Sequence, residues 1–450
     1  MTFPSGLSRF FAWRTPQGKV LRRLVTALFG VFLCQLASAP SVYSAGVVIE
    51  IATVKDLIDA LRNATGGETL RLAPGDYGKL RLVSKDGSLP NYSTPVTITS
   101  ADPKQKAVFR SVSLTKASNL KFIDLEFDYV ADYAASQSAS PFKLMESSNI
   151  TFQNVVFDGD FAKGISLLED GYATGRGLIV RKSENITVQG SLFRNWYRAS
   201  AFGSVKGLQV LNNEVVGSSS DGFDFAKVEN VLISGNHLHD FRKPKGSSAH
   251  ADMIQFWTSG TDAPSRNITI VNNFIDMGAG SSAQSIFMRN ERVDQGQAGA
   301  EMFYQNVTIA NNVIANRHQH GITVGETDGL LIDRNTVIQK AGPAGDKEIP
   351  LPTIKVSKNA VNVKVTNNIA AALAGSVLKP QPGWDVQNNL VVQSNDLRAD
   401  NYVGKILANP LLATTSVRAD FMAASGGRAA KLKIGAMPEG AWLQSAPAQP

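Results

Sequence analysis

The chain has 450 residues, of which 43% are hydrophobic and 18% are charged, with 38 glycines and 19 prolines. This composition excludes a disordered chain, and the length allows a large buried core. The formal net charge of +7 is mild for this length; it is compatible with a polyanionic partner but does not identify one.

Residues 1–45 have the pattern of a signal peptide. Basic residues such as Arg22 and Arg23 precede an apolar stretch at 24–37, which is shorter than the roughly 20 residues of a membrane span. Two small-residue cleavage sites follow, and the one that ends at Ala45 is favoured because Pro40 comes directly after the other. We therefore expect a periplasmic or secreted protein without stable membrane insertion after cleavage.

The single cysteine, Cys34, lies inside that apolar stretch. The mature chain would therefore contain no disulfide, although an exported protein is free to form them. Cysteine nucleophiles and metal–thiolate sites are excluded.

Residues 52–64 have the apolar spacing of a short helix, with Thr53 suitable as its N-cap. A stack of repeats exposes an open end that needs a cover. We expect this helix to cap the N-terminal end of such a stack.

A short phrase recurs along the chain: alternating apolar and polar residues, then an Asn, then another apolar run. Period-2 alternation predicts strands, and a recurrence with a minimum spacing of 21 to 23 residues predicts a solenoid. The Asn side chains are expected to stack inside a turn as a hydrogen-bonded ladder. The Asn positions are Asn213, Asn236, Asn273, Asn312, Asn335, Asn368 and Asn389.

These coils predict an all-β fold, a parallel β-helix. Regular coils are expected over about 66–395 without a linker, which makes 46–450 a single domain. The less regular segment 402–450 should pack along the side of the coils or close their C-terminal end. Insertions between coils, where binding and catalysis concentrate, are expected at 158–176, 239–249, 290–304 and 340–350.

The strands that follow the insertions can be aligned: SDGFDF (220–225), ADMIQF (251–256), AQSIFM (283–288), QHGITV (319–324) and LPTIKV (351–356). Their fourth and sixth positions are apolar and should point inward. The second position reads Asp221, Asp252, Gln284, His320, Pro352, and the fifth reads Asp224, Gln255, Phe287, Thr323, Lys355. Because neighbouring coils lie about 4.8 Å apart, one column brings its residues together.

This wall carries many ionisable residues, and three of the five histidines lie on it. Two stacked acids repel unless a cation or a shared proton intervenes. Asp221, Asp224 and Asp252 are therefore candidate oxygen ligands for Ca²⁺, or supports for a histidine. A solvated ladder of mixed charge is the alternative without a function.

The mixture of acids, histidines and cations suits proton abstraction from a uronic acid. That reaction needs a cation to neutralise the carboxylate, a base near C5 and an acid for the leaving oxygen. A guanidinium pairs with a carboxylate through two hydrogen bonds, which makes Arg289 the best neutraliser. His250 and His320 have suitable pKa values for proton transfer.

The stretch 66–102 resembles the opening coils of the chondroitinase B and alginate lyase family, and LKIGAMP (432–438) resembles a closing phrase of β-helix enzymes. The resemblance implies a right-handed parallel β-helix and polysaccharide cleavage. In that family a Glu-x-Glu calcium pair and a catalytic Lys precede a catalytic Arg on the next coil. Arg289 matches the Arg and Asp252 one carboxylate, whereas His250 replaces the other carboxylate and Trp257 stands in place of the Lys.

We therefore predict an exported, monomeric enzyme that cleaves an acidic polysaccharide by β-elimination and does not bind nucleic acid. The candidate catalytic residues are His250, Asp252, Arg289 and His320, and the candidate substrate contacts are Gln255, Trp257, Lys227 and Lys355. A glycoside hydrolase built on the aspartates, a polyuronate epimerase and a non-catalytic carbohydrate-binding protein are the alternatives.

Overall fold

A computed structural model describes residues 46–83, 92–247, 250–340, 350–410 and 417–438. The predicted signal peptide at 1–45 and most of the insertion at 340–350 lie outside these residues. No helix among the described residues is long and apolar enough to cross a membrane.

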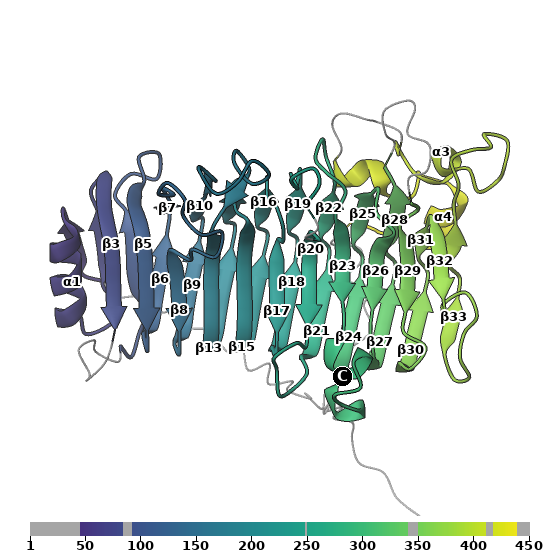
Figure 1. Ribbon diagram of the computed structural model, residues 1–450, viewed down its shortest axis with the longest axis horizontal. Coiled ribbons are helices and arrows are strands. Elements are labelled where there is room, and N and C mark those ends of the chain that lie inside the picture. The colour runs from purple at the N-terminus through teal and green to yellow at the C-terminus, as the bar shows by residue number, and fades with distance from the viewer. Residues whose placement is uncertain (1–45, 84–91, 248–249, 341–349, 411–416, 439–450) are drawn as a thin grey trace, which may run out of the picture. The chain divides into compact units, whose positions relative to one another are not determined.

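Residues from 46 onward form a stack of coils, in which each strand pairs in parallel with its equivalent one coil later (Figure 1). The strands fall into three faces, and the two long strands β13 and β15 run from the first face into the second. This pairing confirms the predicted parallel β-helix.

The first face contains β3 (Gly75–Val83), β5 (Ala107–Thr115), β8 (Phe142–Met145), β13 (Arg176–Gln189), β15 (Arg198–Leu211), β17 (Phe223–Ala226), β20 (Asp252–Trp257), β23 (Gln284–Met288), β26 (His320–Val324), β29 (Thr353–Val356) and β32 (Ala372–Gly375). The second face contains β1 (Val48–Ile51), β2 (Thr69–Leu72), β4 (Val96–Ser100), β6 (Ser118–Ile123), β9 (Ser148–Gln153), β18 (Glu229–Ser234), β21 (Arg266–Val271), β24 (Tyr304–Ala310), β27 (Thr327–Asp333), β30 (Val361–Thr366) and β33 (Asp385–Gln387).

The third face contains β7 (Glu126–Asp128), β10 (Val156–Asp158), β14 (Leu192–Arg194), β16 (Glu214–Val216), β19 (His237–His239), β22 (Phe274–Asp276), β25 (Val313–Asn316), β28 (Thr336–Gln339), β31 (Ile369–Ala370) and β34 (Leu390–Val391).

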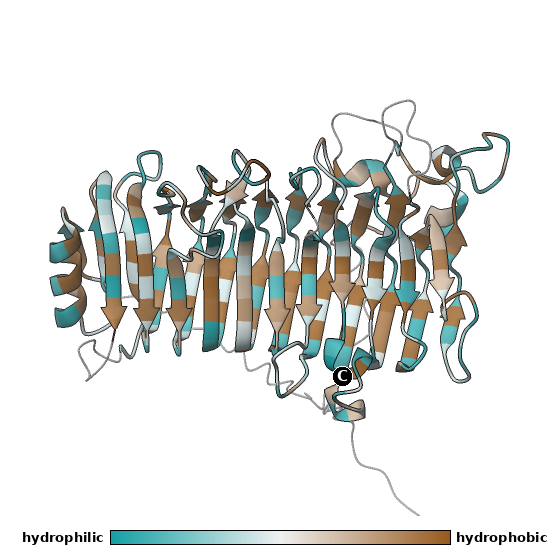
Figure 2. Ribbon diagram, in the orientation of Figure 1, coloured by the Kyte–Doolittle hydropathy of each residue, from teal (hydrophilic) through white to brown (hydrophobic). Residues whose placement is uncertain are grey.

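The core lies inside the coils, because alternate residues of each strand point inward; Figure 2 shows the resulting brown and teal bands across the strands. Inward residues of successive coils stack on one another. Phe225 stacks on Phe256 with ring centroids 4.6 Å apart, and Phe157 stacks on Phe193 at 4.4 Å. Such columns hold the coils in register.

Helix α1 (Val54–Asn63) covers the N-terminal end of the stack, as predicted (Figure 1). Thr53 caps it by accepting a hydrogen bond from the backbone N–H of Asp56 at 3.1 Å, and Leu57 and Leu61 are fully buried. The predicted start of the coils at residue 66 is wrong. Strand β1 precedes the helix and already pairs with β2, because the alternating segment VIEI can add one more strand to the edge.

The buried Asn ladder is confirmed along its whole length. From Asn236 onward, each Asn Oδ1 accepts from both the backbone N–H and the Nδ2 of the Asn one coil earlier. For example, Asn273 Oδ1 lies 3.0 Å from Asn236 N and 2.9 Å from Asn236 Nδ2. The last link joins Asn368 to Asn389. The ladder satisfies polar groups that are buried at the turn in every coil.

A second Asn ladder runs along the surface, and glycines interrupt it at two positions among the described residues: Gly207, and Gly329 between Asn306 and Asn362. Asn185 donates to Asn149, and Asn267 donates to Asn230, but Gly207 stands between these two runs. Gly207 has φ +68°, close to the +54° of Asn185, so its backbone is one that Asn tolerates.

We expect Gly207→Asn to raise the free energy of unfolding by about 1 kcal/mol, because it restricts the unfolded chain and adds amide hydrogen bonds. Asn185 Oδ1 must rotate, since it lies 2.6 Å from the position of the new Cβ. Urea denaturation measures the change. Gly207→Ala is the matched control, because it adds a Cβ at positive φ without an amide group. It should lower the free energy of unfolding. Equal changes in the free energy of unfolding for the two variants would contradict the prediction.

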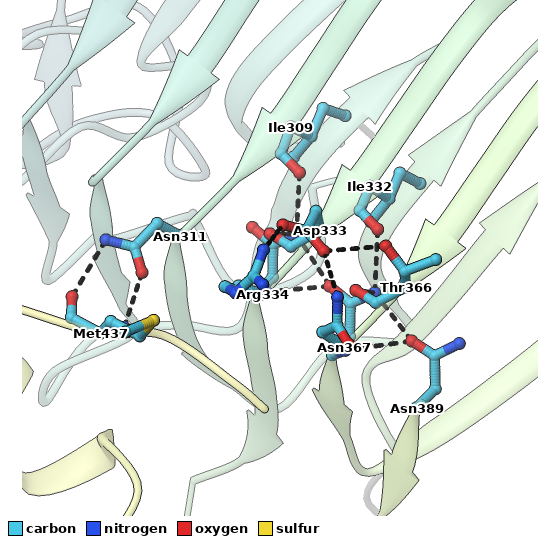
Figure 3. Close-up of polar contacts among 11 residues, drawn as sticks. Ile309, Asn311, Ile332, Asp333, Arg334, Thr366, Asn367, Asn389 and Met437 are labelled. Atoms are coloured by element: carbon cyan, nitrogen blue, oxygen red, sulfur yellow. Dashed lines mark hydrogen bonds and ion pairs between the residues drawn. The ribbon is translucent and has the colours of Figure 1, made fainter. Parts of the chain in front are cut away.

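The C-terminal segment packs along the side of the coils, one of the two expected arrangements. It contains α3 (Val403–Ile406), η2 (Arg418–Phe421) and α4 (Arg428–Lys431). Met437 N donates to Asn311 Oδ1 at 2.6 Å, and Asn311 Nδ2 donates back to the Met437 carbonyl at 3.0 Å (Figure 3). The segment packs on the third face, where Ile406 and Phe421 share one apolar cluster with residues such as Val313.

Two of the predicted insertions have local structure. The first contains the antiparallel pair β11 (Asp160–Phe161) and β12 (Ala173–Thr174). The insertion at 290–304 contains α2 (Glu291–Asp294) and η1 (Ala300–Met302).

Candidate active site

The register of the first face matches the sequence alignment. Asp224 pairs with Gln255, Gln255 with Phe287, Phe287 with Thr323, and Thr323 with Lys355. One expectation is wrong: His320 pairs with Thr353 and not with Pro352, because the register shifts by one residue between β26 and β29.

Asp252 is directed away from the core because the strand departs from strict alternation beside it. Met253 and Ile254 are consecutive residues and both are fully buried in the core. Asp252 and Gln255 therefore lie on the same side of the strand, although two residues separate them.

A buried cluster of charges forms around Arg198. Its Nη2 donates to Asp221 Oδ2 at 2.7 Å, and its Nε forms an ion pair with Asp224. Asp221 and Asp224 are almost completely inaccessible, and the indole of Trp257 lies under the Arg198 guanidinium at 5.6 Å. Burial, together with the charges of Asp221 and Asp252, raises the pKa of Asp224 well above its usual range. No substrate reaches these two acids.

His250 and Asp252 form a hydrogen-bonded pair. His250 Nδ1 lies 2.5 Å from Asp252 Oδ2; the His250 side chain is 60% exposed, whereas that of Asp252 is fully buried. The hydrogen bond to Asp252 raises the pKa of His250 above 6.5. Burial raises the pKa of Asp252 to about 6, so it remains a carboxylate at neutral pH. With Nδ1 bound to Asp252, the Nε2 of neutral His250 carries the free lone pair.

Asp221, His250 and Asp252 each place one potential metal ligand within 4.8 Å of the others. Asp224, which the sequence suggested as a ligand, is not part of this group because it is turned to Arg198. The group fits Ca²⁺ poorly: the ion prefers six to eight oxygens, and here one donor is a nitrogen and Asp221 already pairs with a guanidinium. Asp252 Oδ1, buried and without a hydrogen-bond partner among the described residues, is the atom that could still accept an ion.

The exposed edge of His250 faces a cavity of about 610 Å³, which Lys243, Lys245, Gln284 and His318 also line. His318 Nδ1 accepts a hydrogen bond from the backbone N–H of His320 at 3.2 Å, so the neutral ring carries its proton on Nε2. Burial and the charge of Lys243 lower the pKa of His318, which keeps the ring neutral. The cavity therefore combines a base, a neutral N–H donor and two ammonium groups.

Arg289, His320 and Lys355 line a second cavity of about 440 Å³ at the other end of the same strands. Arg289 follows Met288, which pairs with Phe256, so it lies beside Trp257. Five residues of extended strand, roughly 17 Å, separate Trp257 from Asp252. The structure therefore does not bring Arg289 and His250 to one reacting carbon, in contrast to the expectation from the sequence.

The other predicted substrate contacts differ in accessibility. Gln255 is only 7% exposed, and Trp257 is partly exposed beneath Arg198. Lys227 Nζ forms an ion pair with Asp262 at 2.6 Å, outside both cavities. Lys355 is exposed.

A model of the family described as "Right handed beta helix region" matches residues 254–409. The fold is a right-handed parallel β-helix. The match covers the C-terminal coils of this β-helix, including most of the strands that line the second cavity.

Solved β-helix structures resemble the chain at low identity. An alginate lyase from Paenibacillus sp. str. FPU-7 is 14% identical over 75% of this chain and 99% of its own, with a TM-score of 0.42. The surface adhesin PfbA of Streptococcus pneumoniae is 14% identical over 77% and 92%, with a TM-score of 0.44. The Dettilon tailspike protein is 14% identical over 78% and 63%, with a TM-score of 0.49. These likenesses concern the fold and carry no argument about activity. No curated protein matches the chain.

Sequence reasoning missed Arg198, Lys243 and Lys245. Extending the strand alignment by one coil toward the N-terminus places YRASAF (197–202) beside SDGFDF, which would have found Arg198 opposite Asp221. The two lysines lie in the predicted insertion 239–249, but no periodicity in a loop shows where it turns.

Proposed function

We propose that this β-helix cleaves a uronic-acid polysaccharide by β-elimination in the cavity that His250 faces. The observation that carries the proposal is the His250–Asp252 hydrogen bond at 2.5 Å, with the opposite edge of the imidazole open to a cavity lined by Lys243 and Lys245. A buried carboxylate that orients an exposed histidine is an arrangement for general base catalysis.

In the proposed reaction, His250 Nε2 takes the proton from C5 of the uronate. The ammonium groups of Lys243 and Lys245 neutralise the carboxylate as negative charge moves onto it. The bond between C4 and its glycosidic oxygen then breaks, and a C4–C5 double bond forms. The N–H of His318 hydrogen-bonds the leaving oxygen, which takes its proton from solvent, and His250 returns its proton to solvent.

The alternative of a hydrolase built on the aspartates is less consistent with this geometry. A glycosidase needs two accessible carboxyl groups on either side of the scissile bond. Asp221 and Asp224 are 1% and 0% exposed and pair with Arg198. Their role is to hold the wall and, through Asp252, to position His250.

The direct test is to incubate the protein with a panel of polyuronates and glycosaminoglycans and to follow the ultraviolet absorbance of unsaturated uronate. We expect a rise with at least one polymer. New reducing ends without a rise in absorbance would show that the protein is a hydrolase. Exchange of the C5 proton without new reducing ends would show that it is an epimerase. Binding of the polymer without either reaction would show that it is a carbohydrate-binding protein.

The rate should fall on acidification, because only neutral His250 can accept the proton. The pKa of His250 lies above 6.5, so kcat/KM should decline as pH falls through a value above 6.5. Asp252→Asn replaces the charge-assisted hydrogen bond, the largest cause of this raised pKa, with a neutral one at best, and it should move the decline to lower pH. A pH–rate profile of both proteins measures the shift; a decline at the same pH in both would argue that another group titrates.

Calcium should not be required. Arg198 and His250 already bind Oδ2 of Asp221 and Oδ2 of Asp252, and the backbone N–H of Asp252 binds Oδ1 of Asp221. This leaves Asp252 Oδ1 as the one oxygen of these two carboxylates without a partner among the described residues, too few for an ion that prefers six to eight oxygens. We expect EDTA to leave the elimination rate unchanged within about twofold, measured against the same enzyme with added Ca²⁺. Loss of activity in EDTA and its recovery with Ca²⁺ would show that a metal replaces the His250 hydrogen bond.

We also propose that residues 1–45 direct export and are removed, since polysaccharides of this kind lie outside the cytoplasm. N-terminal sequencing of the protein recovered from the periplasm or medium tests this; a mature chain should begin at Gly46, and a chain that begins at Met1 would contradict it.

A further inference from the structure

The second cavity contains one arginine with free guanidinium N–H groups and two lysines without an ion pair among the described residues. Arg289 contacts Asp294 through Nε at 2.9 Å, while its Nη groups have no acceptor among the described residues. Lys355 and Lys358 are exposed and make no ion pair or hydrogen bond within the described part of the chain. These residues are available to an anionic ligand.

The two acids that line this cavity do not oppose an anionic ligand, because one is paired with a cation and the other is buried. Asp294 binds Arg289, and Glu326, only 5% exposed, accepts a hydrogen bond from Ser357 Oγ at 2.6 Å. The part-exposed ring of Phe287, whose centroid lies 4.9 Å from that of His320, forms an apolar portion of the wall. Cations beside an aromatic ring fit a sugar that carries a carboxylate, because the ring faces C–H groups while the cations bind the anion.

The two cavities lie on one continuous wall. Gln284 lines the first cavity and Phe287 and Arg289 line the second, and all three come from or directly follow strand β23. The separation from Gln284 to Arg289 is roughly 17 Å along the strand, which a chain of several sugar units spans.

We infer that the second cavity is a remote subsite, which binds a carboxylate of the same polyuronate chain several sugar units away from the bond that is cleaved in the first cavity. This inference rests on the proposed function. It implies that the enzyme prefers long chains, because binding energy from a remote unit contributes to kcat/KM only when the substrate reaches it.

The test uses size-defined oligouronates with the full mature chain and the double variant Lys355→Met/Lys358→Met. With the wild type, kcat/KM should rise at the length that reaches the second cavity. The double variant should lose about tenfold on long oligomers and nothing on the shortest one that is cleaved. Lys364→Met, an exposed lysine on the second face, is the matched control and should change neither.

An equal loss at every length, or no loss at any length, would overturn the subsite. Calorimetric binding of a long oligouronate to the wild type and the double variant provides a second readout that does not need turnover. If the wild type binds the oligouronate but does not cleave it, the proposed function fails. In that case, weaker binding by the double variant would still support the subsite. Unchanged binding by the double variant would overturn the subsite as well.

Discussion

His250→Ala should lower kcat/KM for elimination by about a hundredfold to ten-thousandfold, the range for removal of a general base. The side chain is 60% exposed, so its loss creates no cavity in the core. It does, however, leave the buried Asp252 carboxylate without the His250 hydrogen bond, which destabilises this part of the wall in addition to removing the base. The ultraviolet assay measures the rate.

His250→Gln separates the two effects. The glutamine amide can donate to Asp252 in place of Nδ1, but it cannot accept a proton at neutral pH. We expect the same loss of rate with a melting temperature close to that of the wild type. Gln319→Ala, an exposed change on the same wall, should retain full activity. A His250→Gln protein with more than a third of the wild-type rate would show that His250 is not the base.

Asn273→Ala should lower the free energy of unfolding by on the order of 5 kcal/mol, because it leaves several buried groups unpaired at about 1–3 kcal/mol each. Asn273 Oδ1 accepts two hydrogen bonds from Asn236, and Asn273 Nδ2 donates to Asn312 Oδ1 at 2.9 Å and to the Ile233 carbonyl at 3.0 Å. Water cannot replace these contacts, because all three Asn side chains are fully buried. Chemical denaturation measures the loss.

Asn267→Ala is the matched control, since Asn267 belongs to the same coil and to the surface ladder. Its Nδ2 donates to Asn230 at 2.8 Å, and water can take over that contact. Its φ of +54° adds a small strain for alanine, so we expect a loss of about 1 kcal/mol. If the two variants lose similar amounts of unfolding free energy, burial is not the reason that the inner Asn ladder stabilises the protein.

The regular coils were predictable because their inward and outward residues recur at fixed spacings. Inward residues such as Ile254 and Phe256 recur at fixed positions, so the sequence alone indicated the register of β17, β20, β23 and β26. Asn213 and its equivalents mark the turn of each coil for the same reason. The only shift that escaped the alignment follows His320, where β26 and β29 pair with an irregularity that no periodicity reveals.

The site was less predictable because it depends on departures from the repeat. The break in alternation that buries both Met253 and Ile254 decides which way Asp252 points. The pairing of Arg198 with Asp221 and Asp224 removes two acids that the sequence offered as metal ligands. An alignment of columns shows which coil a residue belongs to, but the distance along the strand separates Arg289 from His250, because Arg289 lies beside Trp257 at the far end of β20.

The most direct test of the central claim is cleavage of the preferred polyuronate in water enriched in heavy oxygen, followed by mass spectrometry of the products. Elimination breaks the bond between C4 and oxygen without adding water, so the products should carry no heavy oxygen at the cleaved ends and should be lighter than hydrolysis products by one water. Heavy oxygen in one new end of each product pair would show hydrolysis and would contradict the assignment of His250 as the base of an elimination.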